Sequence, residues 1–261
     1  MTSEAVWARF EDLARAALSA PFSGWDFSFL RGRWSEIELP WDYKARINES
    51  IRSANTMLDI GTGGGEFMAS LTPLPEQTYA TEVYEPNIPI ARERLQPLNV
   101  EVRQYKQREA LPFADAMFDL VINRHTSFDA AEVSRILKPG GQLITQQVGG
   151  ANNLRLNELL TGDQKGWYWS LDLLTDQLRN AGMIIVDGQE HFPEQRFYDI
   201  GAIVYYMRAI PWQLRGYAFE RYRDRLFAIH EMIERDGHLT VTSHRFLIEA
   251  RKPAELTTVT R

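Results

Sequence analysis

The sequence predicts an α/β fold built on a mostly parallel sheet, and three observations support this prediction. Apolar, strand-like runs alternate with helix-length amphipathic segments from residue 56 onward, which is the pattern of β-α-β units with right-handed crossovers. The first of these runs leads directly into the glycine-rich stretch GTGGGE at residues 61–66. No low-complexity tract or linker separates the second half of the chain from the first. We therefore expect a single unit over residues 1–261.

Composition limits the possible classes of protein. Of the 261 residues, 44% are apolar and 25% charged, as in a soluble globular enzyme. The absence of cysteine excludes disulfides, thiolate zinc sites, iron–sulfur clusters and a cysteine nucleophile, and we expect no metal. The N-terminus has no apolar signal core, and no apolar run approaches the ~20 residues of a membrane span. We expect a cytoplasmic protein without a membrane segment, and the net charge of −6 argues against nucleic acid as a partner.

Residues 1–50 predict an N-terminal cap or lid. The first twenty residues have the period of an amphipathic helix. An aromatic stretch follows, which contains Phe22, Trp25, Phe27, Phe29, Trp34, Trp41 and Tyr43. Large aromatic side chains next to a sheet are suited to cover a ligand, although they can also simply form the core between cap and sheet.

Residues 51–150 predict the ligand-binding core. We expect strands at 56–60, 78–84, 100–106, 118–124 and 141–148, with helices at 65–71, 87–98 and 130–137. The strand at 118–124 is apolar at successive positions, as in a strand buried on both faces. The run Lys138-Pro139-Gly140-Gly141 ends the last of these helices.

Residues 151–261 are expected to complete the same sheet and to supply elements on the substrate side. Ser170 and Gly182 delimit a helix over 170–182, and Asp199 caps a second one over 199–210. The remaining expected elements are a strand at 183–192, a long helix at 217–237 and a final strand at 239–252.

The glycine-rich stretch predicts a site for a nucleotide-like ligand. A strand, a glycine turn and a helix N-terminus place such a ligand at the carboxyl end of the sheet. A dinucleotide fingerprint would have a small residue at its sixth position, where this chain has Glu66, a poor neighbour for a pyrophosphate. S-adenosylmethionine is cationic, and Asp59 and Glu66 suit its charge. A turn without any ligand and an NAD-dependent oxidoreductase remain alternatives.

A second acidic residue supports the same site. Glu82 stands near the carboxyl end of the second expected strand. A carboxylate at this place accepts both ribose hydroxyls, which fits adenosine in either class of cofactor. Glu85, three residues further on, is the competing candidate.

Four stretches together resemble the class I S-adenosylmethionine-dependent methyltransferases of the methyltransferase type 11 group. They are MLDIGTGGGEF, ATEVYEPNIPIARERL, REALPFADAMFDLVINRH and AEVSRILKPGGQLI. They stand in the order and spacing of that family over about residues 50–148. The resemblance implies a Rossmann-like sheet with an antiparallel last strand and helices on both faces. It also implies S-adenosylmethionine as the cofactor and S-adenosylhomocysteine as its product.

The resemblance also implies roles for individual residues. Gly61, Thr62 and Gly63 would line the methionine part with Asp59 as support, Glu82 would hold the ribose, and Val83 would pack on the adenine. The family usually has Asp where this chain has Gln107, beside Arg108. The amide oxygen of Gln107 can still accept a hydrogen bond from the adenine amino group. The residues that would face the sulfonium and the methyl acceptor are Asn123, Arg124 and His125.

His125 is the candidate general base, because an ordinary histidine pKa of ~6.5 suits proton transfer near neutral pH. The alternative is that His125 only hydrogen-bonds the backbone or the cofactor carboxylate. Arg124 would hold an acidic acceptor or that same carboxylate. Trp41 and Tyr43 would shield the sulfonium with their ring faces, and Trp25 and Trp34 would line the acceptor pocket.

These features favour a methyltransferase that acts on oxygen or nitrogen of a small, hydrophobic or aromatic organic acceptor, as a monomer or homodimer. One alternative is an rRNA or tRNA methyltransferase that uses the arginine-rich run 208–225, although Glu220 and Asp224 interrupt it at helical spacing. Another is a protein that binds S-adenosylmethionine without catalysis.

Overall fold

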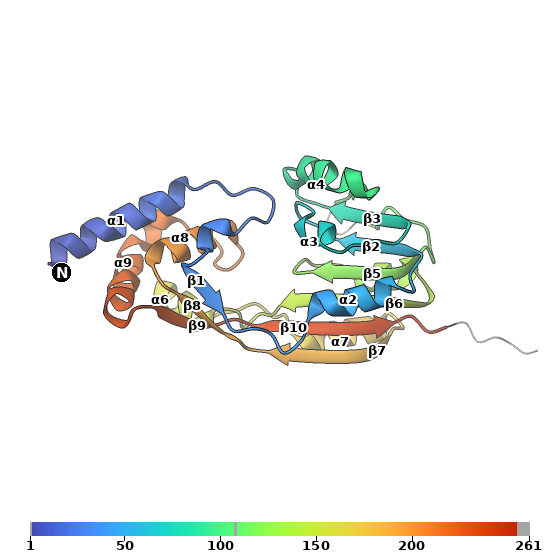
Figure 1. Cartoon of the computed structure of the whole chain (residues 1–261). Helices are drawn as coiled ribbons and strands as arrows, with labels where there is room; N and C mark the ends of the chain where they lie inside the picture. Colours follow the sequence, from blue (N-terminus) through green and yellow to red (C-terminus); the bar gives the residue numbers. More distant parts are fainter. Residues whose placement is uncertain (1, 107–108, 255–261) are drawn as a thin grey trace, which may run out of the picture.

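The computed structural model describes residues 2–106 and 109–254. Its larger sheet has seven strands, in spatial order β4 (Glu101–Gln104), β3 (Gln77–Glu82), β2 (Thr56–Ile60), β5 (Phe118–Arg124), β6 (Leu137–Val148), β10 (Arg245–Arg251) and β7 (Ile184–His191). β2 runs parallel to β3 and β5, and β5 runs parallel to β6. β10 is antiparallel to both of its neighbours. The predicted mostly parallel sheet with an antiparallel last strand is confirmed (Figure 1).

Helices cover both faces of this sheet, as predicted. α2 (Tyr43–Ile51), α3 (Glu66–Ala69) and α4 (Asn87–Leu95), which the 3-10 turn η2 (Gln96–Leu98) extends, contribute to the hydrophobic core on one face. α5 (Ala130–Ile136) and α7 (Leu171–Asn180) contribute to the core on the other face. All five residues of β2 are buried, because a central parallel strand is covered on both sides. Ser170 caps α7, as predicted, by accepting the Leu173 N–H at 3.3 Å.

A second body packs beside the carboxyl edge of the sheet, and we call it the cap (Figure 1). It has its own antiparallel sheet of β1 (Trp34–Glu36), β8 (Glu194–Phe197) and β9 (Leu239–Thr242). The helical elements around it are α1 (Ser3–Ser19), η1 (Ser28–Leu30), α6 (Leu154–Thr161), α8 (Ile200–Ala209) and α9 (Phe219–Asp236). These elements share one hydrophobic core, which is separate from the two cores of the larger sheet.

The cap corrects two expectations about residues 151–261. Only β7 and β10 of this segment complete the larger sheet, while β8, α8, α9 and β9 belong to the cap. The expected strand at 239–252 is two strands in different sheets, separated by Ser243 and His244. The backbone N–H of Ser243 bonds to the Pro193 carbonyl at 3.0 Å, and that of His244 bonds to Asn152 Oδ1 at 3.1 Å. Sequence alternation did not reveal this change of partner, because only two residues separate the two strands. A single unit over 1–261 stays a prediction.

Buried polar side chains join the cap to the larger sheet. Arg245, at the start of β10, donates to Asn152 Oδ1 at 2.7 Å and to Glu36 Oε1 at 3.1 Å. The hydroxyl of Ser243 also donates to Glu36. His244 Nε2 lies 2.9 Å from a carboxylate oxygen of Glu190. A partnered arginine–carboxylate pair of this kind fixes the geometry between two packed bodies, so the cap is held at one position relative to the strand ends.

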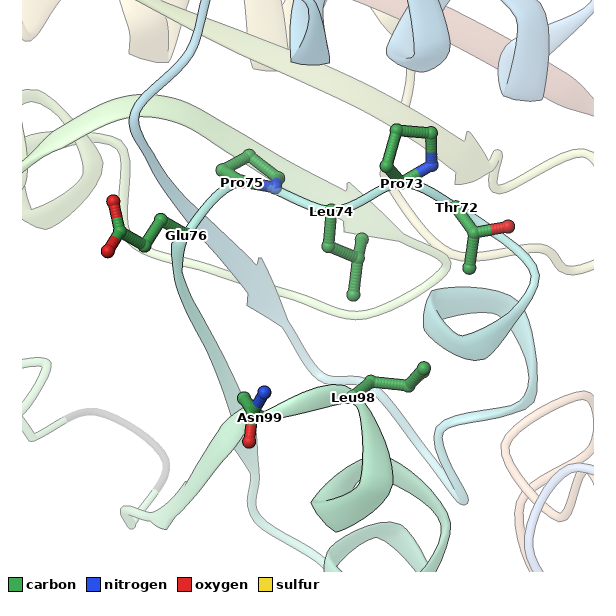
Figure 2. A pocket seen from close by; sticks show the side chains of 7 residues that line it. All are labelled: Thr72, Pro73, Leu74, Pro75, Glu76, Leu98 and Asn99. Atoms are coloured by element: carbon green, nitrogen blue, oxygen red, sulfur yellow. The ribbon is translucent and has the colours of Figure 1, made fainter.

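A hollow of about 300 Å³ lies at the opposite, amino edge of the sheet. Figure 2 shows its lining, which comes from residues 72–76 just before β3 and from Leu98 and Asn99 just before β4. Glu76 is its one charged lining residue. Ligands of open α/β sheets bind outside the carboxyl ends of the strands, so this hollow is not the candidate site.

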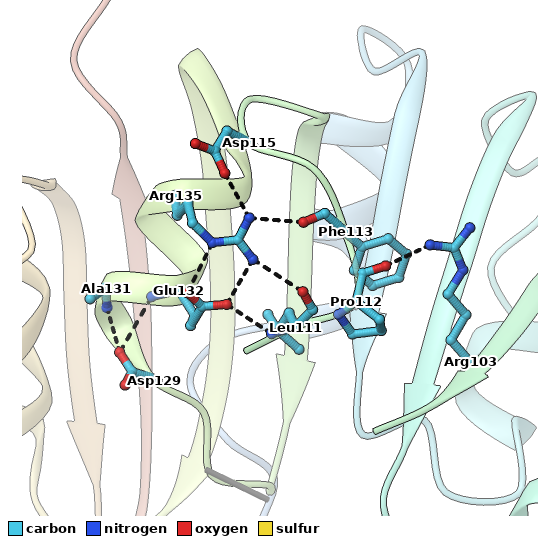
Figure 3. A network of polar contacts seen from close by, with 9 residues as sticks. All are labelled: Arg103, Leu111, Pro112, Phe113, Asp115, Asp129, Ala131, Glu132 and Arg135. Carbon is cyan, nitrogen blue, oxygen red and sulfur yellow. Dashed lines mark hydrogen bonds and ion pairs between the residues drawn. The ribbon is translucent and has the colours of Figure 1, made fainter. Parts of the chain in front are cut away.

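Arg135 on α5 anchors the loop that precedes β5 (Figure 3). Its guanidinium donates to the carbonyl oxygens of Leu111 at 3.1 Å and Phe113 at 2.8 Å. It also pairs with Glu132 and Asp115 at 2.7 and 2.8 Å. Glu132 in turn accepts the Leu111 N–H at 2.7 Å. Arg135 and Glu132 thus bind the carbonyl and the N–H of Leu111. The loop follows the predicted adenine-contacting positions 107 and 108, which lie outside the described residues.

We predict that Arg135→Met lowers the free energy of unfolding by about 2 kcal/mol, because it leaves partly buried carbonyl and carboxylate oxygens without a donor. Urea denaturation followed by circular dichroism measures this change. Arg179→Met is the matched control, since Arg179 is exposed and its only ion pair with a described residue spans 3.9 Å. It should cost less than about 0.5 kcal/mol. Equal losses in both variants would show that Arg135 does not anchor the loop.

Candidate functional site

The turn after β2 is fastened to the neighbouring strand. The backbone N–H groups of Gly61 and Thr62 both donate to the carbonyl oxygen of Thr81 in β3, at 3.0 and 2.9 Å. Gly61 has φ +76°, and a Cβ there would lie 2.2 Å from the side chain of Thr126. Glycine is required at this position both for its conformation and for the close approach of the loop after β5. Part of the glycine signal in the sequence therefore reflects packing within the protein.

Glu82 organises the backbone around the ends of β2 and β3. One carboxylate oxygen accepts the Gly63 N–H at 2.7 Å. The other accepts the N–H groups of Val83 at 2.8 Å and Tyr84 at 2.7 Å. Burial raises the pKa of Glu82, and these backbone donors offset part of that shift. A carboxylate has about four acceptor positions, so Glu82 keeps limited capacity for a ribose hydroxyl, while Glu85 is exposed.

Asp59 is buried beneath the same turn, with 3% of its surface exposed. Burial raises its pKa to about 7. The nearby Thr62 hydroxyl and the Arg124 guanidinium act against this shift, and the Glu82 carboxylate adds to it. A carboxyl group poised near neutrality can become fully ionised when a cation binds beside it.

Asn123 corrects one expectation. It is fully buried, and its amide group donates to the Ile60 carbonyl of β2 at 2.9 Å. Its amide oxygen accepts from Thr145 at 3.0 Å and from Gln147 at 2.5 Å, both on β6. The side chain therefore braces three neighbouring strands and does not face a ligand. The sequence offered no signal for this, because a polar residue at a strand end can point either way.

The aromatic residues before and at the start of α2 lie against the carboxyl ends of β5 and β6. The Trp41 indole N–H donates to Gln146 Oε1 at 2.9 Å. The Tyr43 hydroxyl donates to the Asn123 carbonyl at 2.8 Å, and its ring stacks on Phe67 at 5.3 Å between centroids. Both side chains are buried, at 7% and 6% exposed. Their predicted role in shielding a sulfonium stays a prediction.

Arg124 is the last residue of β5, and His125 follows it. His125 has φ +61°, and its backbone N–H bonds to the Gln146 carbonyl at 2.8 Å. Its Nε2 lies 3.1 Å from the Gln146 amide nitrogen. Arg124 is exposed, and its guanidinium carbon lies 4.9 Å from the centre of the Phe67 ring. Within residues 2–106 and 109–254, no hydrogen bond or ion pair engages this guanidinium.

The loop between α1 and η1 reaches from the cap onto the glycine turn (Figure 1). A Cβ placed on Gly24 would lie 3.6 Å from the Cα of Gly64, and one placed on Gly63 would lie 3.7 Å from the Cβ of Trp25. The Trp25 ring stacks on Trp212 from the loop after α8, with 5.9 Å between centroids and 4° between planes. The prediction of a lid over the turn is consistent with this contact.

The predicted role of Trp34 in lining the acceptor pocket stays a prediction. Trp34 belongs to β1 and packs against the hydrophobic core of the cap. Gln107 and Arg108 lie outside the described residues, so their predicted adenine contacts stay predictions. In the ranges that the structure describes, no cluster of His, Asp and Glu is arranged to hold a metal ion. Over the same ranges, no helix has the length and apolar character needed to cross a membrane.

Comparison with known proteins identifies the domain that carries this turn. A family model of the methyltransferase domain matches residues 58–145. A protein-L-isoaspartate O-methyltransferase from Azoarcus sp. is 31% identical over 121 residues, which cover 44% of this chain and 56% of that protein. The methyltransferase YcgJ of Bacillus subtilis, described as uncharacterized, is 26% identical over 102 residues, or 36% of this chain and 40% of YcgJ.

Solved structures share the fold at low sequence identity. The crystal structure of YcgJ superposes with a TM-score of 0.57 at 15% identity, covering 81% of this chain and 98% of YcgJ. A protein from Deinococcus radiodurans, described as functionally unknown, gives a TM-score of 0.56 at 14% identity, covering 94% and 99%. The chain spans 31% to 56% of the length of the curated relatives it matches. The family model identifies residues 58–145 as a methyltransferase domain, the chain has the fold of solved class I methyltransferases, and S-adenosylmethionine is the cofactor of this domain.

Proposed function

We propose that this protein transfers the methyl group of S-adenosylmethionine to an oxygen or nitrogen atom of a small organic acceptor. The observation that carries the proposal is the arrangement at the carboxyl edge of the sheet. There the glycine turn, with acids at 59 and 82, lies directly beneath a loop of the cap. A cofactor on the turn and an acceptor under the cap would share one space that the protein can close against water.

The residues at this edge suit the parts of the cofactor. The turn at Gly61–Gly63 leaves backbone exposed to the methionine part, with Asp59 beneath it to balance positive charge. The remaining acceptor capacity of Glu82 suits a ribose hydroxyl, and Val83, which is half-buried, offers an apolar surface to the adenine. When bound, the cofactor supplies a methyl group already activated by its sulfonium. The protein then has to align the acceptor and exclude water.

Aromatic residues of the cap support a small acceptor with apolar surface. Trp25 contacts Phe22 and Phe27 edge-on and stacks on Trp212. Trp25 and Trp212 are 36% and 50% exposed. Large rings that remain accessible beside a cofactor turn are suited to bind an apolar part of a substrate.

The alternative of an RNA acceptor receives less support from the arginine-rich run. Arg208 donates to the backbone carbonyls of Leu18 and Ala20. Arg223 pairs with Glu11 at 2.6 Å. These two guanidinium groups join α1 to α8 and α9, so they are not free to neutralise phosphates.

The fold alone does not fix the chemistry. The cyclase SpnF superposes with a TM-score of 0.50 at 18% identity, covering 94% of this chain. The competing hypothesis is that the protein has this fold but does not transfer a methyl group, and an experiment has to exclude it.

Incubation with methyl-labelled S-adenosylmethionine and a fractionated cell extract tests the proposal. We expect label in the small-molecule fraction and none in the RNA fraction. Label in RNA would favour the alternative acceptor. If no fraction gains label while calorimetry still detects S-adenosylhomocysteine binding, the protein binds the cofactor without catalysis.

We predict that the affinity for S-adenosylmethionine rises with pH up to about 7. The free carboxyl of Asp59 has a pKa of about 7, and the cationic groups of the cofactor favour its ionised form, so binding releases a proton. If Asp59 is fully ionised in the complex over this range, the affinity increases about fivefold between pH 6 and 7 and under about twofold between pH 7 and 8. Calorimetry in two buffers of different ionisation enthalpy measures the released proton.

The raised pKa of Asp59 changes the stability of the fold with pH in the opposite direction to the affinity. Because the folded state holds the proton more tightly than the unfolded chain, the cofactor-free protein loses stability as pH rises from about 4 to about 7. Asp59→Asn should remove the pH dependence of the affinity and reduce that of the stability, to which Glu82 also contributes, whereas Asp172→Asn, an exposed aspartate on α7, should retain both. A pH-independent affinity in the unmodified protein would contradict the placement of Asp59 beside the cofactor.

A further inference from the structure

We infer that the methyl acceptor atom is a carboxylate oxygen of a small organic acid. This inference rests on the proposed methyl transfer and narrows it to one acceptor chemistry. At the end of β5, the guanidinium of Arg124 and the ring N–H of His125 are hydrogen-bond donors without a partner among the described residues, and several side chains that could act as a base are engaged elsewhere. Such a surface suits an acceptor that is anionic and already nucleophilic.

The hydrogen bonds around His125 fix its tautomer. An indole N–H can only donate, so the bond from Trp41 requires the amide oxygen of Gln146 to face Trp41. The amide NH₂ of Gln146 must then face His125, where it lies 3.1 Å from Nε2. Nε2 therefore accepts, and the ring proton of neutral His125 is on Nδ1. Nδ1 has no hydrogen-bond partner among the described residues and is not among their fully enclosed unpartnered atoms, so its N–H is left for a ligand to bind.

Positive charge surrounds this donor. Arg124 is adjacent and exposed, and no described carboxylate pairs with it. Burial lowers the pKa of His125 well below its usual value, and the charges of Arg124 and Arg245 lower it further. His125 thus stays neutral, and Nε2 is held by Gln146, so the ring is poorly placed to remove a proton from an acceptor. The predicted role of His125 as general base is replaced by that of a donor.

The neighbouring acids do not supply a base either. Asp59 is buried beneath the turn, and both oxygens of Glu82 accept backbone N–H groups. Glu36 accepts from Ser243 and Arg245. The carboxylate of Glu190 is engaged by His244. None of these four carboxylates is therefore well placed to take a proton from an acceptor at this edge.

A carboxylate satisfies these constraints. Its oxygen attacks the methyl carbon, the new C–O bond forms as the C–S bond breaks, and the bonding pair returns to sulfur. The sulfonium becomes a neutral sulfide, the carboxylate becomes a neutral methyl ester, and no proton moves. Arg124 and the Nδ1–H of His125 can bind the second carboxylate oxygen while the methyl group is transferred. A cationic ammonium group would be repelled by Arg124.

The stability of the product to alkali tests the inference. The protein is incubated with methyl-labelled S-adenosylmethionine and the small-molecule fraction of a cell extract, and in parallel with benzoic and cinnamic acids and their amides. We expect label that alkali releases as volatile methanol, as from a methyl ester. Label that survives alkali, as in an ether or an N-methyl group, would overturn the carboxylate while leaving the proposed function intact. The absence of any label would overturn both.

Nitrogen NMR of histidine-labelled protein tests the tautomer without any substrate. We expect His125 as the Nδ1–H form at neutral pH. In Gln146→Glu, the new carboxylate can accept from Trp41 and from the ring, so the proton should move to Nε2. The Nε2–H form in the unmodified protein would contradict the donor role.

The variant Arg124→Gln tests whether Arg124 binds the methyl acceptor or the carboxylate of the cofactor. We expect the KM for the acid that receives the labelled methyl group to rise at least tenfold. The affinities for S-adenosylhomocysteine and for methylthioadenosine should change less than threefold. Arg52→Gln, an exposed arginine at the amino edge of the sheet, is the matched control and should change neither. A tenfold loss of affinity for S-adenosylhomocysteine alone would show that Arg124 binds the cofactor carboxylate, and it would overturn the acceptor role.

Discussion

The candidate site depends on how the turn after β2 is tied to β3. The Thr81 carbonyl accepts two N–H groups from the turn, and the Glu82 carboxylate accepts a third from Gly63. These bonds cross between neighbouring parallel strands, so the position of the turn follows from the register of the sheet. Asp59 lies beneath this turn, and its proton affinity follows from burial. The acid two residues before the first glycine is thus enclosed under the turn, where we propose that it balances the positive charge of the cofactor.

The chemistry at the ends of β5 and β6 illustrates how one donor-only group can determine a longer chain of hydrogen bonds. The indole of Trp41 orients the amide of Gln146, and that amide orients the ring of His125. A histidine after a strand is a reasonable candidate base when only its type and place are known. Its partners change this interpretation, because a nitrogen that already accepts a hydrogen bond is not free to accept a proton from a substrate.

The cap gives the site its second wall. Its position is fixed by the buried pair of Arg245 and Glu36 and by Asn152, which binds the same guanidinium. From this base, the loop with Gly24 and Trp25 extends onto the glycine turn. The proposed acceptor space therefore lies between two bodies with separate hydrophobic cores.

The sequence by itself determined the parallel sheet, the positions of its first five strands along the chain, the cofactor and the glycine turn. These features depend on local periodicity and on closely spaced motifs. Only the tertiary structure decided that residues 239–252 divide between two sheets and that Asn123 points inward. It also decided the tautomer of His125. The physical reason is that each of these depends on partners distant in the chain, here Trp41 and Gln146, and no local pattern encodes their approach.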